Sequence, residues 1–249
     1  MSQLNVIQLI EAVTKKLRSE TTKLFPKLIA ECKQVSWVYN PLDYAWLSHR
    51  EWIHRFSGNG AKILLVGMNP GHGMGNTGVP FGCPEQVRDF LNIKNVSIGH
   101  PPKQHPKRPV IGLECTKPEV SGRRIWTFLA QKYGSAENVS RKVFVTNHCP
   151  LWMFDNSGKN VTPDKLTGSA AKKLMSLCDD YLRTVVEIMN IQSVIGIGRY
   201  AERQAKVLFK NTEITVDWVP HPSPASPFSN RNGGADWRKA FGTVLDNNS

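Results

Sequence analysis

The amino-acid sequence predicts a three-layer α/β/α sandwich around a central, mostly parallel sheet of four strands. Four short apolar runs rich in β-branched residues have the length of buried strands. Stretches with helical periodicity lie between and after them, and strands that alternate with helices build parallel sheets covered on both faces. We expect the 249 residues to form a single domain, because one hydrophobic core can serve a chain of this length.

The elements are expected in a regular order along the chain. Residues 3–33 carry apolar side chains at helical spacing, so we expect one helix or two there, adjusted at Pro26 and packed on the domain. The stretch 93–120 has no clear period and is expected to be an excursion from the sheet. Strands are expected at 62–67, 142–147, 193–198 and 214–220, and the other helices at 43–56, 121–134 with Ser121 as its cap, from TPDKL (162–166) to about 189, 199–210 and 236–246.

Charge and cysteine usage narrow the class of protein. The chain has 32 Lys and Arg against 20 Asp and Glu, a net charge of +12, which favours polyanionic partners and nucleic acid above all. Simple solubility is the alternative at this point. Five cysteines without a CxxC pair predict neither disulfides nor a zinc or iron–sulfur site, and no signal peptide or membrane span is visible. We therefore expect an intracellular protein without a metal, in the nucleus of a eukaryote or the cytoplasm of a bacterium.

Polar residues and prolines follow each of the four expected strands, in the sequences MNPG, HCPL, RYAE and HPSP. Open α/β sheets bind ligands beyond the carboxyl ends of their strands, so a site is expected at this rim. Taken singly, Asn69 could be a turn residue, Asn147 a cap and His221 a loop histidine. Together with Phe81 they would make a hydrogen-bonding pocket for a planar heterocycle.

The sequence does not support the motifs of several other classes of enzyme. Residues 73–78 match GxGxxG, but we expect no helix before about residue 85, after Pro80 and Pro84, so a dinucleotide site is rejected. A Walker lysine, HExxH, a close carboxylate pair at a strand end and a serine nucleophile elbow are likewise missing from the sequence.

Six separated motifs carry a resemblance to a known family. GMNPG (67–71), TGVPFG (77–82), EVSG (119–122), NHCPL (147–151), GIGRYAE (196–202) and HPSP (221–224) resemble the single-strand-selective monofunctional uracil-DNA glycosylases, a branch of the uracil-DNA glycosylase superfamily. The resemblance covers about residues 39–237. It implies that superfamily's fold and a monomeric hydrolase without cofactor or lyase activity. Its substrates would be uracil and 5-substituted uracils such as 5-hydroxymethyluracil in single- and double-stranded DNA. The base would be flipped out and excised for base-excision repair, leaving an abasic site.

The resemblance also assigns roles at the expected rim. Asn69 would position the attacking water and His221 would donate to uracil O2. Asn147 would read the edge of the base, and Phe81 would stack on its face. The pocket would be completed by Met68, Gly71 and Met74, with Gly71 standing where the classical uracil glycosylases carry a tyrosine that blocks C5 substituents.

HPSP and the segment through Gly234 resemble the family's loop that wedges into the duplex. Two departures from the pattern affect these assignments. The segment 72–76 is one residue shorter than in vertebrate members, and Ala225 stands where an arginine usually follows PSP, so Phe228 or Arg231 is the expected plug instead. The residues expected at the DNA are Ser121, Ser223, Pro224, Ala225, Phe228 and Arg231.

Two alternatives stay open at this point. One is a mismatch-type thymine/uracil glycosylase, against which NHCP and HPSP argue. The other is a non-catalytic α/β module that binds nucleic acid.

Overall fold

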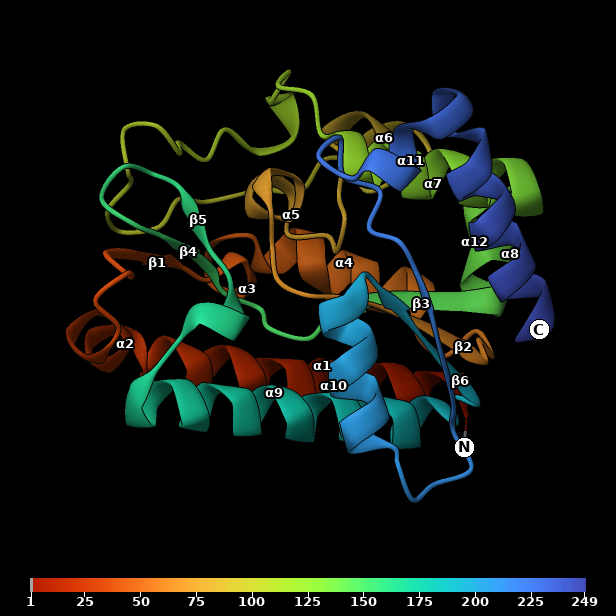
Figure 1. Ribbon diagram of the computed structural model, residues 1–249, viewed down its shortest axis with the longest axis horizontal. Helices are drawn as coiled ribbons and strands as arrows, with labels where there is room; N and C mark the ends of the chain where they lie inside the picture. Colours follow the sequence, from red (N-terminus) through yellow and green to blue (C-terminus); the bar gives the residue numbers. More distant parts are fainter. Residues whose placement is uncertain (1) are drawn as a thin grey trace.

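A computed structural model describes residues 2–249 and contains a central sheet of four parallel strands (Figure 1). The strand order is β3-β2-β6-β7, and every pairing within this sheet is parallel. All four strands lie where the sequence predicted them, and each residue of β2, β3 and β6 is buried, as expected for apolar runs covered on both faces. Their bounds are β2 Ile63–Gly67, β3 Val143–Asn147, β6 Ser193–Ile197 and β7 Thr215–Val219.

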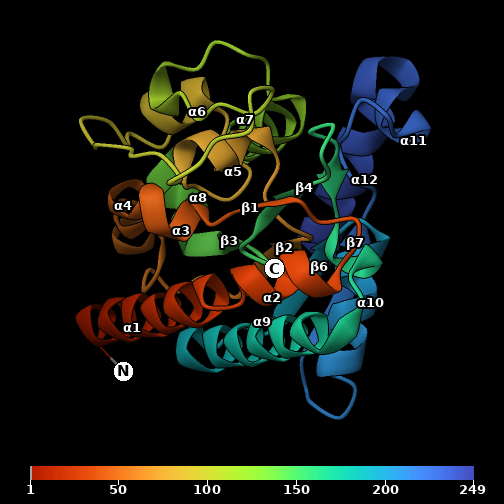
Figure 2. The same cartoon turned by 90° about the vertical axis from the view of Figure 1, so that its left-hand side faces the viewer.

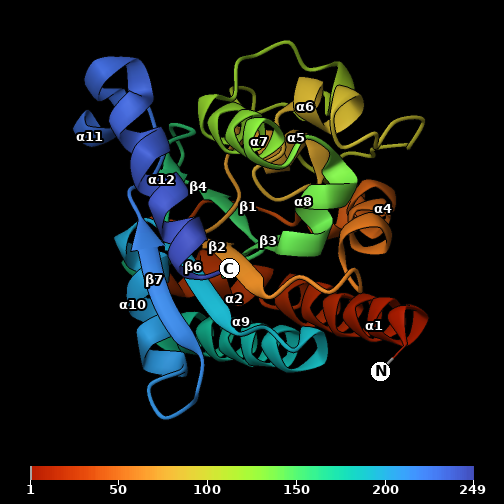
Figure 3. The same cartoon turned by 90° about the vertical axis from the view of Figure 1, so that its right-hand side faces the viewer.

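Helices cover both faces of this sheet, which confirms the three-layer architecture (Figures 1 and 3). One layer contains α1 (Gln3–Thr22), α9 (Gly168–Met189) and α10 (Arg199–Leu208). In Figure 2, α1 and α9 run side by side along the bottom of the molecule, and they are in direct contact. The opposite layer contains α4 (Trp46–Phe56), α7 (Val120–Tyr133), α8 (Ala136–Lys142) and α12 (Ala235–Asn247).

Aromatic side chains join the α4 layer to the sheet. The Trp52 ring stacks on Phe56 of the same helix with centroids 3.9 Å apart, and on Phe144 of β3 at 5.6 Å. Trp126 of α7 meets Trp52 edge-on at 5.5 Å. These side chains are almost completely buried, so they fix α4 and α7 against the strands that end at the predicted rim.

Several helix boundaries differ from the prediction. The segment 3–33 forms two helices, α1 and α2 (Phe25–Glu31), and Pro26 lies in the first turn of α2, where its missing N–H is harmless. The helix expected at 43–56 is divided into α3 (Pro41–Tyr44) and α4. Ser121 is not the cap of α7, because the Glu119 carboxylate accepts the Gly122 N–H and Ser121 lies in the first turn.

The prediction that no helix begins before about residue 85 was wrong. The six-residue helix α5 (His72–Thr77) starts among the glycines and ends at Gly78, whose φ of +73° suits glycine, before Pro80 could interrupt it. A Cβ at Gly75 would overlap the Trp152 ring, so close packing explains this glycine without a phosphate ligand. Helix α6 (Pro84–Asp89) then begins at the expected place.

A second, antiparallel sheet was not predicted. It has the order β1-β4-β5, and its strands are only two or three residues long: β1 (Trp37–Tyr39), β4 (Trp152–Phe154) and β5 (Asn160–Val161). Segments this short show no alternation that sequence reasoning can use. The stretch 93–120 is an excursion, as predicted, with one 3₁₀ turn at Gly112–Glu114. The remaining short helical turns are Pro163–Lys165, α11 (Pro227–Asn230) and Arg231–Gly234.

None of the helices within residues 2–249 combines the length and apolarity needed to span a bilayer. Over the same residues, no group of three or more His, Cys, Asp or Glu side chains is placed to hold a metal ion.

Candidate active site

A cavity of about 280 Å³ lies at the carboxyl ends of β2, β3 and β7, the rim predicted from the sequence. Most of the predicted site residues line it, although they come from segments far apart in the chain. These are Met68, Asn69, Gly71, Met74, Phe81, Ser121, Asn147, His221 and Ser223. The sequence did not single out the other lining residues, which are Pro70, Gly73, Glu119, Asn160 and Thr162.

Asn69 lies two residues beyond β2, and its amide orientation is fixed by two carbonyl groups. The Nδ2 atom donates to Leu151 O at 3.2 Å and to Pro70 O at 3.3 Å. Because both amide hydrogens are engaged in this way, Oδ1 is left as an acceptor for a ligand. A neutral amide oxygen can hold and orient a water molecule, but it has no useful basicity.

Asn147 is the last residue of β3 and pairs in register with Gly67 at the end of β2. Its side chain is 7% exposed and donates from Nδ2 to Met74 Sδ at 3.1 Å. A Cβ at Gly67 would overlap Asn147 Oδ1 and would lie 2.6 Å from the Phe81 ring. Gly67 is therefore the position that lets the amide and the aromatic ring approach each other, a function that sequence reasoning did not assign to it.

Phe81 is held in an uncommon backbone conformation, with φ at +52°. Its carbonyl oxygen accepts the Trp126 Nε1–H at 3.0 Å, and Gly122 of α7 packs so closely that a Cβ there would overlap the same oxygen. The surrounding helix thus fixes the strained residue. Local strain of this kind costs about 1–3 kcal/mol and persists only where neighbours enforce it.

The imidazole of His221 faces Phe81 from the loop after β7. The ring centroids are 6.2 Å apart at an interplanar angle of 42°. Neither ring nitrogen has a hydrogen-bond partner among residues 2–249, and burial lowers the pKa of His221 below its usual value of 6.5. The ring is therefore neutral at physiological pH, with one N–H to donate and no protein group competing for it.

Side chains hold the His221 loop by its carbonyl oxygens. The segment 220–224 contains three prolines, which have no N–H group to donate. Regular backbone hydrogen bonds therefore cannot hold this segment in place. The donors come instead from α7, α11 and α12: Trp237 Nε1 to Pro220 O at 2.7 Å, Ser229 Oγ to His221 O at 2.7 Å, Arg124 Nη1 to Pro222 O at 3.1 Å, and Asn230 Nδ2 to Pro224 O at 2.6 Å. We call these four residues the carbonyl clamp; none was identified from the sequence.

Glu119 is the only acidic residue among those lining the cavity. Burial raises the pKa of its carboxyl group, although the Gly122 and Ser121 backbone N–H groups that it accepts act in the opposite direction. These two hydrogen bonds cap α7 and occupy the carboxylate. Glu119 therefore fixes the first turn of α7, and with it Ser121, at the cavity wall.

The remaining predicted DNA contacts lie outside the cavity. Pro224 and Ala225 are exposed on the loop. Phe228 is partly buried and packs against the main core, whereas Arg231 is exposed, with its guanidinium carbon 5.8 Å from the Phe228 ring centroid. Of the two expected plugs, Arg231 is therefore the more exposed.

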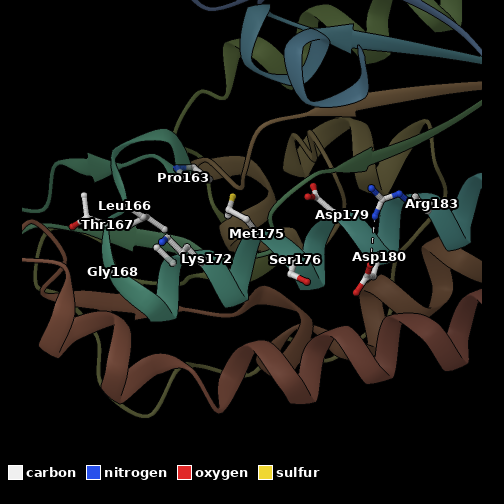
Figure 4. A pocket seen from close by; sticks show the side chains of 11 residues that line it. Pro163, Leu166, Thr167, Gly168, Lys172, Met175, Ser176, Asp179, Asp180 and Arg183 are labelled. Carbon is white, nitrogen blue, oxygen red and sulfur yellow. Dashed lines mark hydrogen bonds and ion pairs between the residues drawn. The ribbon is translucent and has the colours of Figure 1, made fainter. Parts of the chain in front are cut away.

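A different cavity, of about 420 Å³, lies along α9 and contains no predicted site residue (Figure 4). Its wall includes Asp179, whose Oδ1 lies 2.8 Å from His148 Nε2. The other ring nitrogen of the fully buried His148 lies 2.9 Å from the Tyr200 hydroxyl. The histidine of the NHCPL motif is therefore satisfied within the protein, and its role is to anchor the segment that follows Asn147.

Comparisons with known proteins identify the family of the chain. The model of the uracil DNA glycosylase superfamily matches residues 54–243. The chain is 43% identical over 197 residues to a single-strand selective monofunctional uracil-DNA glycosylase of Rattus norvegicus, covering 78% of this chain and 70% of the relative. A relative of the same name from Bos taurus is 42% identical over 197 residues, covering 78% of this chain and 72% of its own length.

A solved structure shares the fold at low sequence identity. The crystal structure of wild-type Pedobacter heparinus SMUG2 superposes with a TM-score of 0.57 at 18% identity, covering 90% of this chain and 96% of that one. The sequence motifs, the cavity that they line and these similarities lead to one assignment. The chain belongs to the single-strand-selective monofunctional uracil-DNA glycosylases, within the uracil-DNA glycosylase superfamily.

Proposed function

We propose that this protein excises uracil from DNA by hydrolysing the bond between base N1 and deoxyribose C1′, and that it leaves an abasic site for base-excision repair. Its family makes it a hydrolase of the monofunctional glycosylase type. One observation carries the proposal: Asn69, Phe81, Asn147 and His221 line a single cavity at the sheet rim. We further propose that it acts as a monomer without a metal, in the nucleus of a eukaryote or the cytoplasm of a bacterium.

Base recognition in this proposal requires the nucleotide to leave the helix. The extruded uracil stacks on Phe81, and Asn147 pairs with its edge, accepting from N3–H through Oδ1 and donating to O4 through Nδ2. Cytosine presents the opposite donor and acceptor pattern at these two atoms. It would leave buried polar groups unpaired, which proteins discriminate strongly.

Bond cleavage in this proposal depends on Asn69 and His221. Water held by Asn69 Oδ1 attacks C1′ as the C1′–N1 bond breaks, and the bonding pair moves into the base, where charge gathers on O2. The neutral His221 ring donates its free N–H to that oxygen and lowers the energy of the leaving base. The water oxygen stays on C1′ as a hydroxyl, and the proton it releases is balanced by protonation of the base.

An oligonucleotide containing one deoxyuridine tests the proposed function. We expect alkali-labile cleavage at that position after incubation with the protein, and no cleavage before alkali, since no lysine lies in the matched motifs to form a lyase intermediate. Both single strands and duplexes should react. An oligonucleotide that stays intact in both forms after alkali would favour the binding-only alternative, and excision restricted to mismatched thymine and uracil would favour the mismatch-type enzyme.

We also propose that 5-substituted uracils, including 5-hydroxymethyluracil, are substrates. Gly71 lines the cavity, and a Cβ built on it meets no atom within 4 Å. Its φ of −102° is accessible to any residue, so neither packing nor backbone conformation requires glycine here. The absence of a side chain therefore leaves space in the cavity, where a C5 substituent could enter.

Replacing Gly71 with tyrosine should reduce excision of 5-hydroxymethyluracil far more than excision of uracil. The backbone accepts the new side chain, which then occupies the space left for the C5 group. Single-turnover rates on matched oligonucleotides measure the ratio, with Gly71→Ala as the control that should retain both activities. Equal losses on the two bases would mean that Gly71 does not control access at C5.

A further inference from the structure

A basic cavity of about 380 Å³ lies between α7 and α12, outside the site described above. Arg123, Arg124 and Arg238 line it, together with the rings of Phe128 and Trp237, and we call it the arginine groove. Both helices are visible beside α11 in Figure 1. No acidic residue is among those that line the groove.

The walls of the arginine groove are fixed by packing between the two helices. The Phe128 ring lies 6.2 Å from Trp237 and 5.0 Å from Phe241, centroid to centroid. Farther along the same helices, Lys132 and Asp246 form an ion pair at 2.6 Å. These contacts fix α7 and α12 relative to each other, so the groove between them has a defined shape.

Two of the three guanidinium groups have no acidic partner among residues 2–249. Arg123 pairs with Glu85 at 2.7 Å, but Arg124 donates to Pro222 O and Asn230 Oδ1, and Arg238 donates to Gly233 O at 3.1 Å. These acceptors are neutral, and each guanidinium carries five N–H donors, so donors remain free. The groove thus has uncompensated positive charge and geometry suited to two-pronged contact with phosphate.

The arginine groove adjoins the catalytic cavity through two shared segments. On α7, Arg124 comes three residues after Ser121, which lines that cavity. Arg124 also binds the carbonyl group of Pro222, the residue after His221. A strand that delivers a nucleotide into the cavity therefore has its neighbouring phosphates close to the groove.

We propose that the arginine groove binds the phosphodiester backbone of the DNA strand next to the extruded nucleotide. The identity of this ligand rests on the proposed function. The three arginines of the groove, the absence of acidic residues from its lining and its position beside the His221 loop do not depend on that function. The contact strengthens DNA binding without reading sequence, and each phosphate neutralised adds to the dependence of binding on salt.

Arg238 gives the cleanest test, because it is exposed and its only hydrogen bond within residues 2–249 is to Gly233 O. Fluorescence anisotropy of a uracil-free duplex over a series of salt concentrations should show weaker binding by Arg238→Ala. The slope of log K against log salt should become shallower by about 0.9, the value for one lost phosphate contact. Arg238→Glu should bind more weakly still. Single-turnover excision at saturating DNA should match the wild type.

The control is Arg203→Ala, which removes an exposed arginine from α10 on the opposite face of the sheet and should leave the salt slope unchanged. Arg238→Gln and thermal melting exclude a folding defect. Wild-type affinity and slope in both Arg238→Ala and Arg238→Gln would overturn the proposal. Failure of the wild type to release uracil would refute the proposed function instead, while the slopes on uracil-free DNA still decide whether the groove binds the backbone.

Discussion

Replacing His221 with alanine is expected to slow single-turnover release of uracil by a factor of about 100 to 1,000, the usual cost of losing one donor to a developing oxyanion. The reason is the isolation of the ring: it faces the cavity, stays neutral, and has no hydrogen-bond partner in residues 2–249. Its N–H is therefore unsatisfied until a ligand atom arrives, and the benefit grows as charge gathers on O2.

The carbonyl clamp makes this variant informative. Its donors bind main-chain oxygens, so the loop should keep its course when the imidazole is removed. Affinity for uracil-containing DNA should consequently change little, and His221→Gln, which supplies an amide donor, should recover part of the rate. Alanine at the exposed His100 is the matched control. A wild-type rate in His221→Ala would remove the proposed donor role.

Replacing Asn69 with alanine is expected to lower the same rate at least about a hundredfold, because a misplaced nucleophile costs that much even when other groups are intact. Two carbonyl oxygens orient the amide so that Oδ1 is available to water. In the proposed mechanism the side chain takes no part in stacking or edge recognition, so binding of uracil-containing DNA, measured by anisotropy, should be preserved. A variant that cleaves at the wild-type rate would show that the water is held elsewhere.

Asn69→Asp distinguishes positioning from proton abstraction. A carboxylate is a stronger base than an amide, but here it would face Leu151 O and Pro70 O, and oxygen would oppose oxygen where Nδ2 now donates. Desolvation and repulsion should favour the protonated acid or turn the group away. We therefore expect Asn69→Asp to remain well below the wild type. Full activity in this variant would argue that a general base can replace the positioned amide.

The strands and the rim were predictable because their signals are local. Each strand of the central sheet is five residues long and mostly apolar, and polar residues stand at its carboxyl end or directly after it in the chain. Asn69, Asn147 and His221 meet because parallel strands end at one edge, so the fold class alone predicts their convergence. The resemblance to the family then added roles that the residue pattern had left open.

Features that depend on distant contacts were not predictable. Helix α5 forms where Gly75 can lie against Trp152, and β1 joins the short second sheet by pairing with β4, over a hundred residues away in the chain. The N-cap of α7 is Glu119, whereas the sequence predicted Ser121. Only the folded arrangement shows which side chain reaches the N–H groups of the first turn. Ser229 likewise gains its role only once α11 folds back beneath His221.

The carbonyl clamp also makes the position of the His221 imidazole independent of the side chains at the loop tip. Every residue keeps its main-chain oxygen when its side chain changes, so substitutions at the loop tip need not displace the His221 imidazole. Ala225 lies at the exposed tip of the loop, and the donors that hold the loop bind other positions. The exposed loop tip can therefore change in sequence without a change in the position of the imidazole behind it.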